Sequence, residues 1–284
     1  MELLSPEEIR HAVTLALAED IGSGDVTTLA TIPETATARA VLRAREPMVV
    51  AGLALAEAAF CELSPDVQVA RLAQDGQQAA EGRSLLTIAG PARALLSAER
   101  VALNFVQRLS GIATLTAQFV DAVKGTRVQI LDTRKTTPGW RRLEKYAVGC
   151  GGGRNHRFGL FDMVLIKDNH LVALGNEYRN PVTAAVGRAR AACPQLKIEV
   201  EADTLEQVEQ AVAAGADLVL LDNMNLIQLR LAVQKCQGRV QTEASGGVTL
   251  AGVRAIAETG VDFISVGALT HSARAVDIGL DFEL

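Results

Sequence analysis

The sequence is short of aromatic residues, of positive net charge and of long apolar runs. Aromatic residues make up 4% of the 284 positions, too few for a surface that stacks nucleic-acid bases. The net charge of −5 argues against a generally basic nucleic-acid-binding protein. No apolar run approaches the roughly 18 residues that a transmembrane helix needs, and the acidic start, Met1–Glu8, lacks the apolar core of a signal peptide.

Cysteine and several catalytic signatures are also scarce. The four cysteines are widely separated and form no C-x-x-C pair: Cys61, Cys150, Cys193 and Cys236. Reduced thiols in a cytoplasmic protein explain this spacing better than disulfides or a zinc site. There is no Ser-His-Asp pattern, no metal-binding histidine pair and no P-loop.

Apolar residues are plentiful, at 49% of the chain, so a large core is expected. Ser5–Glu8 has the residue types of a helix N-terminus and predicts a helix through about Leu17. Short β-like runs alternate with turns from about Ala38 to Ile88, which indicates a small α+β domain. The amphipathic stretch Ala92–Val123 predicts a long helix, which Gly111 is expected to bend or divide.

The second half of the chain alternates short apolar runs with helical patterns. The expected strands are Val128–Leu131, Met163–Ile166, Ile198–Val200, Leu218–Leu221, Val240–Thr242 and Phe263–Val266. The expected helices are Pro181–Ala192, Leu205–Ala214, Leu226–Cys236 and Leu250–Thr259. Continuous apolar strands separated by helices are typical of a buried parallel sheet in an α/β barrel.

Polar or glycine-rich residues follow each of these strands. The clusters are Asp132–Lys135, Lys167–His170, Glu201–Asp203, Asp222–Asn223, Glu243–Gly247 and Gly267–Ala268. The carboxyl ends of barrel strands meet at one face, where α/β barrels place their active sites. Turn chemistry alone would explain one such cluster, but six indicate a site.

Positive charge is concentrated between residues 134 and 167, where eight cations face two acids. Such local asymmetry favours an anionic ligand. Arg141, Arg142 and Lys145 fit a solvated helix equally well. Arg134, Lys135 and Lys167 flank apolar strands, where a buried cation is costly without an anionic partner.

Two further patterns carry candidate chemistry. Gly151–Gly153 precedes Arg154, His156 and Arg157 and is either a flexible linker or a loop that approaches a ligand closely. Glu201 and Asp222 end successive strands and suit either Mg²⁺ with phosphates or general acid and base roles.

Two glycine-containing loops follow the last two strands. Such loops of α/β barrels frequently bind a phosphate group through backbone N–H groups. The residues are Ser245, Gly246, Gly247, Gly267 and Ala268. Together, the cations, the carboxylates and the glycine-containing loops predict a ligand that has many negative charges and a phosphate group and that binds with a divalent metal.

Several of these motifs resemble one enzyme family. They are Asp132–Gly139, Gly151–Arg157 and Leu165–His170, with further matches at Asp20–Thr27, Glu99–Asn104, Leu220–Asn223, Glu243–Gly247 and Val266–Ser272. Together they resemble quinolinate phosphoribosyltransferase, also called carboxylating nicotinate-nucleotide pyrophosphorylase, over almost the whole chain. The family's Glu-x-Ser-Gly-Gly pattern contains Ala244 here, which affects no expected role.

The resemblance implies an α/β fold with two domains. Residues 1–112 would form an N-terminal α/β sandwich and residues 113–284 an incomplete, about seven-stranded α/β barrel, with the extreme C-terminus packed back on the N-terminal domain. It also implies a homodimer, possibly a higher homo-oligomer, in which Arg100 reaches the partner's active site.

The resemblance implies a transferase, specifically a pentosyltransferase, that joins quinolinate to phosphoribosyl pyrophosphate. The products would be nicotinate mononucleotide, pyrophosphate and CO₂, a step of de novo NAD biosynthesis. Quinolinate would bind Arg100, Arg134, His156, Arg157 and Lys167. Lys135, Glu201 and Asp222 would be catalytic, with Glu201 and Asp222 holding Mg²⁺. Ser245, Gly246, Gly247, Gly267 and Ala268 would hold the 5-phosphate. His271 is expected to lie in the core.

Three alternatives stay open at this point. A paralogue associated with molybdenum transport would use a different acceptor. A barrel lyase would use Lys167 as a Schiff-base nucleophile. A phosphometabolite-binding protein of the same fold would have no activity.

Overall fold

The computed structural model describes residues 3–175 and 180–283 and divides into two compact units. Unit 1 comprises Met1–Ala117, Thr137–Gly152 and Leu269–Leu284. Unit 2 comprises Gln118–Thr136 and Gly153–Ala268. Unit 1 thus combines three separate segments of the chain. Among the described residues, no helix is long and apolar enough to cross a membrane.

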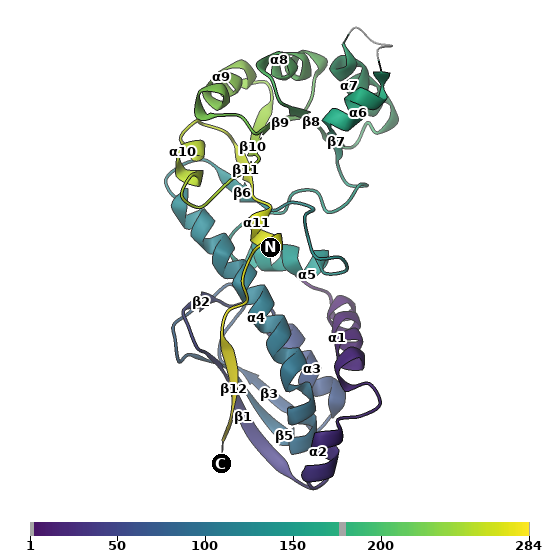
Figure 1. The fold of residues 1–284 in the computed structure, drawn as a ribbon, viewed down its shortest axis with the longest axis vertical. Helices are drawn as coiled ribbons and strands as arrows, with labels where there is room; N and C mark the ends of the chain where they lie inside the picture. The colour runs from purple at the N-terminus through teal and green to yellow at the C-terminus, as the bar shows by residue number, and fades with distance from the viewer. Residues whose placement is uncertain (1–2, 176–179, 284) are drawn as a thin grey trace. The chain divides into compact units, whose positions relative to one another are not determined.

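Unit 1 is built on an antiparallel four-stranded sheet in the order β12-β1-β5-β3. The strands are β1 (Thr37–Ala44), β3 (Gln68–Arg71), β5 (Ser84–Pro91) and β12 (Ile278–Glu283), and a separate pair is formed by β2 (Met48–Val49) and β4 (Gln78–Ala79). Leu42 of β1 lies opposite Leu280 of β12, so the C-terminal segment completes a sheet of N-terminal strands (Figure 1).

The helices of unit 1 are α1 (Pro6–Ile21), α2 (Val26–Thr31), α3 (Leu53–Leu63), α5 (Arg141–Cys150) and most of α4 (Ala92–Ala122). At the start of α1, Ser5 Oγ accepts the Glu8 N–H at 3.1 Å, and Glu8 accepts the Ser5 N–H at 2.7 Å. This reciprocal capping box confirms the predicted helix start. The long predicted helix is also confirmed as α4.

Gly111 does not divide the helix as one of the two expectations had it, because α4 runs without a break through this position. A Cβ atom at Gly111 would lie 1.9 Å from the carbonyl oxygen of Arg274. The glycine therefore allows the C-terminal segment to approach the helix closely.

Two further side chains of unit 1 differ from their expected positions. Lys145 of α5 is 1% exposed, so α5 is not simply a solvated charged helix. Its neighbour Glu144 is fully buried and accepts hydrogen bonds from Arg108 and Thr137. The burial of Glu144 is tolerated because its carboxylate oxygens accept these hydrogen bonds. His271, expected in the core, is exposed and lies 2.6 Å from Ser272 Oγ.

Unit 2 contains a parallel sheet in the order β6-β11-β10-β9-β8-β7. Its strands are β6 (Gln129–Leu131), β7 (Val164–Ile166), β8 (Ile198–Ala202), β9 (Leu218–Asp222), β10 (Gln241–Ser245) and β11 (Phe263–Ser265). Each overlaps a predicted strand. A parallel bridge from Leu131 to Arg154 adds one more segment beside β6, on the side away from β11. This arrangement is an incomplete barrel.

Helices cover the outside of this sheet. They are α6 (Asp168–Ala173), α7 (Pro181–Ala192), α8 (Leu205–Ala214), α9 (Leu226–Cys236) and α10 (Val253–Ala257), with α11 (Ala268–His271) following β11 (Figure 1). Asn180, Thr204 and Asn225 cap the N-termini of α7, α8 and α9. Strand–helix alternation in this order brings the carboxyl ends of the strands to one face.

Candidate active site

Unit 2 contains a cavity of about 420 Å³ at the carboxyl ends of its strands. The lining residues come from nearly every strand end and from the loop before β7. They are Thr133, Arg134, Lys135, His156, Arg157, Leu165, Lys167, Glu201, Leu220, Asp222, Asn223, Glu243, Ser245, Gly246, Gly247 and Ser265. Five of the six strand-end clusters of the sequence therefore contribute to one cavity.

The strands place their side chains in two layers, because residues two apart on a strand face the same side. We call the layer at the strand ends the mouth layer; it comprises Lys167, Glu201, Asp222 and Ser245. The inner layer lies two residues earlier on each strand and comprises Leu165, Glu199, Leu220 and Glu243. Glu199 and Glu243 are therefore placed beneath the polar mouth.

Lys167 and Glu201 form an ion pair in the mouth layer. Lys167 stands at the N-terminus of α6, and its backbone N–H donates to His170 Nδ1 at 2.9 Å. His170 therefore supports the position of Lys167 from its own helix. The Lys167 side chain remains 44% exposed and can turn to a ligand in the cavity.

Asp222 lies beside Glu201 at the end of the neighbouring strand. Burial and the negative charges of Glu201 and Asp203 raise the pKa of Asp222. Asn223 Nδ2 donates to Asp222 at 2.6 Å. Carboxylates that repel one another at an accessible site favour a bound cation, and oxygen ligands of this kind suit Mg²⁺.

The loop after β10 needs glycine. Gly246 has φ +94°, and a Cβ atom there would lie 2.1 Å from Asn223 Oδ1. The Asn223 N–H donates to the Ser245 carbonyl at 2.9 Å, so the ends of β9 and β10 are tied together. The close approach leaves the backbone of Gly246 and Gly247 exposed at the cavity.

Arg134 and Arg157 bring positive charge to the cavity. Burial and the charge of Arg134 lower the pKa of Arg157, while Glu199 and Asp162 oppose this effect. Arg157 Nη1 donates to the Met163 carbonyl at 3.3 Å. Two neighbouring guanidinium groups repel each other, and an anionic ligand relieves the repulsion.

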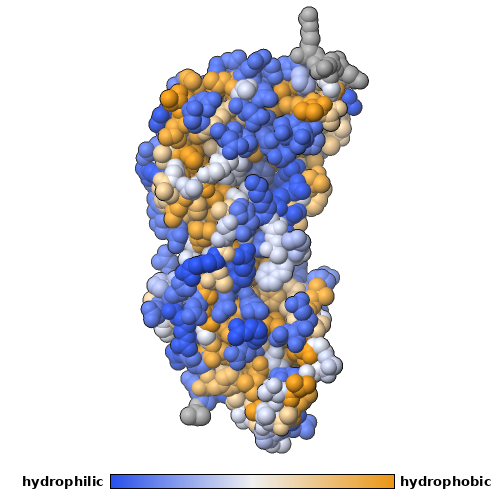
Figure 2. All heavy atoms as spheres, viewed as in Figure 1, coloured by the Kyte–Doolittle hydropathy of each residue, from blue (hydrophilic) through white to orange (hydrophobic). Residues whose placement is uncertain are grey.

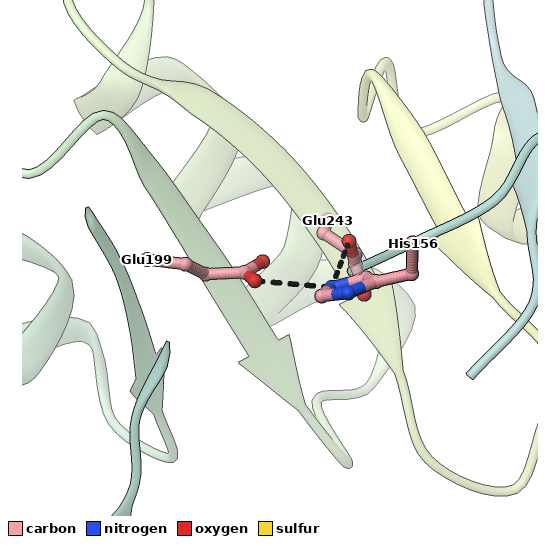
Figure 3. Close-up of side chains that lie close together, drawn as sticks. All are labelled: His156, Glu199 and Glu243. Carbon is pink, nitrogen blue, oxygen red and sulfur yellow. Dashed lines mark hydrogen bonds and ion pairs between the residues drawn. The ribbon is translucent and has the colours of Figure 1, made fainter. Parts of the chain in front are cut away.

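His156 lies between the two buried glutamates of the inner layer (Figure 3). Its Nε2 is 3.1 Å from Glu199 Oε2 and 3.4 Å from Glu243 Oε2. The three side chains are 8%, 0% and 1% exposed, respectively. We call them the inner triad. The other ring nitrogen, Nδ1, accepts the backbone N–H of Arg157 at 2.7 Å.

Two effects oppose each other at His156. Burial lowers the pKa of its imidazole, whereas the facing carboxylates of Glu199 and Glu243 raise it. A second ring proton, however, would sit on Nδ1 and face the N–H of Arg157. That contact is repulsive, so the ring in this arrangement carries one proton, on Nε2. Burial and Glu243 in turn raise the pKa of Glu199 to about 7.

Comparison with known proteins gives matches along nearly the whole chain. Residues 25–110 match the model of the quinolinate phosphoribosyl transferase N-terminal domain, and residues 112–281 match that of the C-terminal domain. The chain belongs to the quinolinate phosphoribosyl transferase family.

Individual relatives and solved structures agree with this assignment. A nicotinate-nucleotide pyrophosphorylase [carboxylating] of Mycobacterium leprae is 46% identical over 278 residues, covering 96% of each chain. A probable enzyme of the same name from Bacillus subtilis is 45% identical, covering 94% of this chain and 90% of the relative. The nicotinate-nucleotide pyrophosphorylase structure from Francisella tularensis is 38% identical, with a TM-score of 0.93, covering 99% of this chain and 98% of that chain.

Most residues predicted for this phosphoribosyl transferase site lie together in unit 2. Arg134, His156, Arg157 and Lys167 line the cavity with Lys135, Glu201, Asp222, Ser245, Gly246 and Gly247. Gly267 and Ala268 follow β11 and, within the described residues, are not among those lining the cavity. Arg100 is an exposed residue of α4 in unit 1.

Sequence reasoning missed the inner triad. Glu199 was treated as part of an apolar strand, and Glu243 as part of a strand-end turn. The available signal was the spacing Glu199-x-Glu201, which places a second carboxylate on the inward face of β8. His156 was expected to face a substrate, but both its ring nitrogens contact protein groups.

Proposed function

We propose that this chain transfers the phosphoribosyl group of phosphoribosyl pyrophosphate to quinolinate, with loss of CO₂. Family membership supports the reaction class. The observation that carries the proposal is the single cavity that combines a cationic side, Arg134, Arg157 and Lys167, with the carboxylates Glu201 and Asp222. Such a cavity suits a dicarboxylate beside a metal-bound pyrophosphate.

The cations would orient quinolinate. Planar guanidinium groups such as those of Arg134 and Arg157 suit carboxylates, because two parallel N–H groups can donate to two oxygens. The Lys167 ammonium group would contact the same ligand, either by leaving Glu201 or by keeping its ion pair with Glu201 as well. His156 would support this edge of the cavity, because its Nδ1 accepts the backbone N–H of Arg157. Held in place, the ring nitrogen of quinolinate attacks C1 of the ribose as the C1–oxygen bond to pyrophosphate breaks.

Decarboxylation needs no organic cofactor. After alkylation the pyridinium ring stabilises the electron pair left on C2 when CO₂ departs, and a proton then forms the new C–H bond. Cations near the ring would favour the developing negative charge at C2. The products are nicotinate mononucleotide, pyrophosphate and CO₂, which places the reaction in de novo NAD biosynthesis.

Glu201 and Asp222 would hold Mg²⁺, and Lys135 would contact phosphoribosyl pyrophosphate near its reacting end. Bound Mg²⁺ would neutralise the charge of the departing pyrophosphate. Backbone N–H groups of the Ser245–Gly247 loop, with Gly267 and Ala268, would bind the 5-phosphate. The exposed glycine backbone at Gly246 and Gly247 supports this role.

A homodimer would supply Arg100 to the partner's site. The surface of unit 1 supports an interface because it carries exposed apolar side chains on α1 and α2, where Figure 2 shows orange surface near α2. Leu15, Val26 and Leu29 are 59%, 77% and 55% exposed, respectively. Clusters of this kind often mark interfaces.

The cytoplasmic location expected from the cysteines stays a prediction.

The test is product formation from phosphoribosyl pyrophosphate, Mg²⁺ and either quinolinate or nicotinic acid. We expect nicotinate mononucleotide and CO₂ from quinolinate, and no product from nicotinic acid. Turnover of another acceptor without turnover of quinolinate would favour the molybdenum-transport-associated paralogue. The ion pair between Lys167 and Glu201 argues against a Schiff-base lyase, because that nucleophile must be an uncharged amine. A chain that binds both substrates without turnover would be the phosphometabolite-binding alternative.

A further inference from the structure

The inner triad has a geometry that substrate binding alone does not explain. His156 Nε2 faces Glu199 and Glu243, and Nδ1 faces the backbone N–H of Arg157 (Figure 3). Neither ring nitrogen is left to serve a ligand directly. The ring instead connects strands β8 and β10 to the loop that carries Arg157.

The two carboxylates are deeply buried and converge on this ring. Among residues 3–175 and 180–283, neither oxygen of Glu243 has a hydrogen-bond partner, and Glu199 Oε1 has none. Buried acceptors without full partners are costly, so such groups persist where they serve a specific contact. That contact is the shared approach of Glu199 and Glu243 to Nε2.

The loop that the ring holds is anchored at other points as well. The His156 backbone N–H donates to the buried Asp132 at 2.8 Å. Arg154 pairs with Leu131 through a parallel bridge, and Arg157 Nη1 contacts the Met163 carbonyl. These contacts fix the main chain on both sides of His156. The imidazole adds the link that determines the orientation of the Arg157 backbone.

We infer that Glu199 is a positioning residue that accepts the Nε2–H of His156, with the Glu243 carboxylate beside the same nitrogen, and that it thereby holds Arg157 in its orientation at the cavity. This inference rests on the proposed function, because Arg157 is there assigned to bind quinolinate. With its proton kept on Nε2, the ring presents an unprotonated Nδ1 to the Arg157 N–H. A preorganised guanidinium group loses less entropy when the dicarboxylate binds.

A metal ion is the competing explanation. The ligand atoms of the inner triad lie within 4.8 Å of one another, which is close enough to surround a small cation. A histidine that binds a metal through Nε2 normally donates an Nδ1–H to an acceptor. Here Nδ1 is itself the acceptor. The geometry therefore favours a proton over a metal between the ring and the carboxylates.

The test compares two substitutions of similar length at one position. Glu199→Met removes the acceptor, whereas Glu199→Gln keeps a carbonyl oxygen. We expect Glu199→Met to raise the KM for quinolinate about tenfold, as loss of one hydrogen bond to a charged group would. The KM for phosphoribosyl pyrophosphate should stay unchanged, and Glu199→Gln should recover most of the loss. Glu209→Gln, at an exposed ion pair with Lys235, is the matched control.

Equal effects of Met and Gln, or equal effects on both substrates, would overturn the inference, because space filling or general stability would then explain them. The unliganded chain provides a readout that does not depend on activity. Nitrogen NMR of labelled histidine should show His156 protonated on Nε2 and unprotonated on Nδ1, and Glu199→Met should alter that pattern. The reverse tautomer, or a stoichiometric metal that is lost in Glu199→Met, would refute the positioning role. If quinolinate is not a substrate but the tautomer is as expected, only the proposed function fails. Should Glu199→Met fail to fold, the wild-type tautomer and Glu199→Gln remain as tests.

Discussion

The mouth layer and the inner layer of the barrel use carboxylates in opposite ways. Glu201 and Asp222 stand at strand ends, where an ammonium group and solvent are within reach. Glu199 lies two residues before Glu201 on β8, and Glu243 lies two residues before Ser245 on β10. Both glutamates are fully buried. The mouth carboxylates can exchange partners during a reaction, whereas the inner pair has one fixed partner, His156.

This difference reflects how each layer is solvated. A charge at the mouth keeps part of its hydration and can accept a metal ion or a lysine in turn. A charge in the inner layer has lost its water and depends on one hydrogen bond. We therefore expect substitutions in the mouth layer to affect catalysis, and substitutions in the inner layer to affect stability and substrate affinity.

The largest effect should come from Glu201→Gln, which keeps the side-chain size and removes the charge. If Glu201 helps to hold Mg²⁺ against the departing pyrophosphate, kcat/KM should fall about 100-fold or more. Initial rates measured across Mg²⁺ concentrations would check this, since the Mg²⁺ requirement should also rise. Glu206→Gln, an exposed residue in the first turn of α8, should behave as wild type. A normal rate for Glu201→Gln would contradict the expectation that substitutions in the mouth layer affect catalysis.

The next effect concerns the stability of the inner layer. His156→Leu leaves Glu199 and Glu243 buried without their shared donor, and should lower the free energy of unfolding by about 3 kcal/mol. Adding Glu199→Met and Glu243→Met should recover most of this loss, because an apolar cluster replaces unpaired charges. Urea denaturation at neutral pH would measure both changes.

The matched change in the mouth layer is Lys167→Met, which also removes a cation from a carboxylate. We expect it to cost about 1 kcal/mol, less than His156→Leu, because Glu201 borders the cavity and keeps 10% of its side chain exposed, whereas Glu199 and Glu243 are fully buried. If Lys167→Met and His156→Leu destabilise equally, depth in the barrel is not what separates the two layers.

The same contrast explains what could be predicted from the sequence. The strands of unit 2 and the mouth layer follow local rules: apolar runs form buried strands, and polar residues follow them. Glu201 and Asp222 could therefore be placed correctly at neighbouring strand ends. The fold class followed from the same alternation of strands and helices.

The inner triad depends on contacts between distant parts of the chain. His156 and Glu199 are 43 residues apart, and no local pattern indicates that they meet. A charged residue inside a strand is normally assigned to solvent, since buried charges are rare. For the same reason, a solvated helix is one of two interpretations that the sequence allows for Lys145, although the residue is buried. Buried charges escape sequence reasoning because their partners are non-local.

The smallest effect should come from an ion pair at the surface of unit 1, which provides a reference for both layers. Glu46 accepts hydrogen bonds from Arg274 Nη1 at 2.7 Å and from the Asp277 N–H at 2.8 Å. The hydrogen bond from Arg274, followed by that from Asp277, lowers the pKa of Glu46 from 4.5 to about 2. The unfolded chain therefore takes up this proton at a higher pH than the folded chain does. The stabilisation is present above pH 4.5 and is lost as the pH falls through about 2.

Glu46→Gln should remove this contribution. Because the pair is largely solvated, we expect a loss of less than about 1 kcal/mol at neutral pH, and wild type and variant should converge as the pH approaches 2. Urea denaturation at pH 7 and at pH 3 would measure the difference and its decrease. A loss at pH 7 as large as that of His156→Leu would mean that burial does not set the strength of these pairs, and the distinction between the two layers would then need another cause.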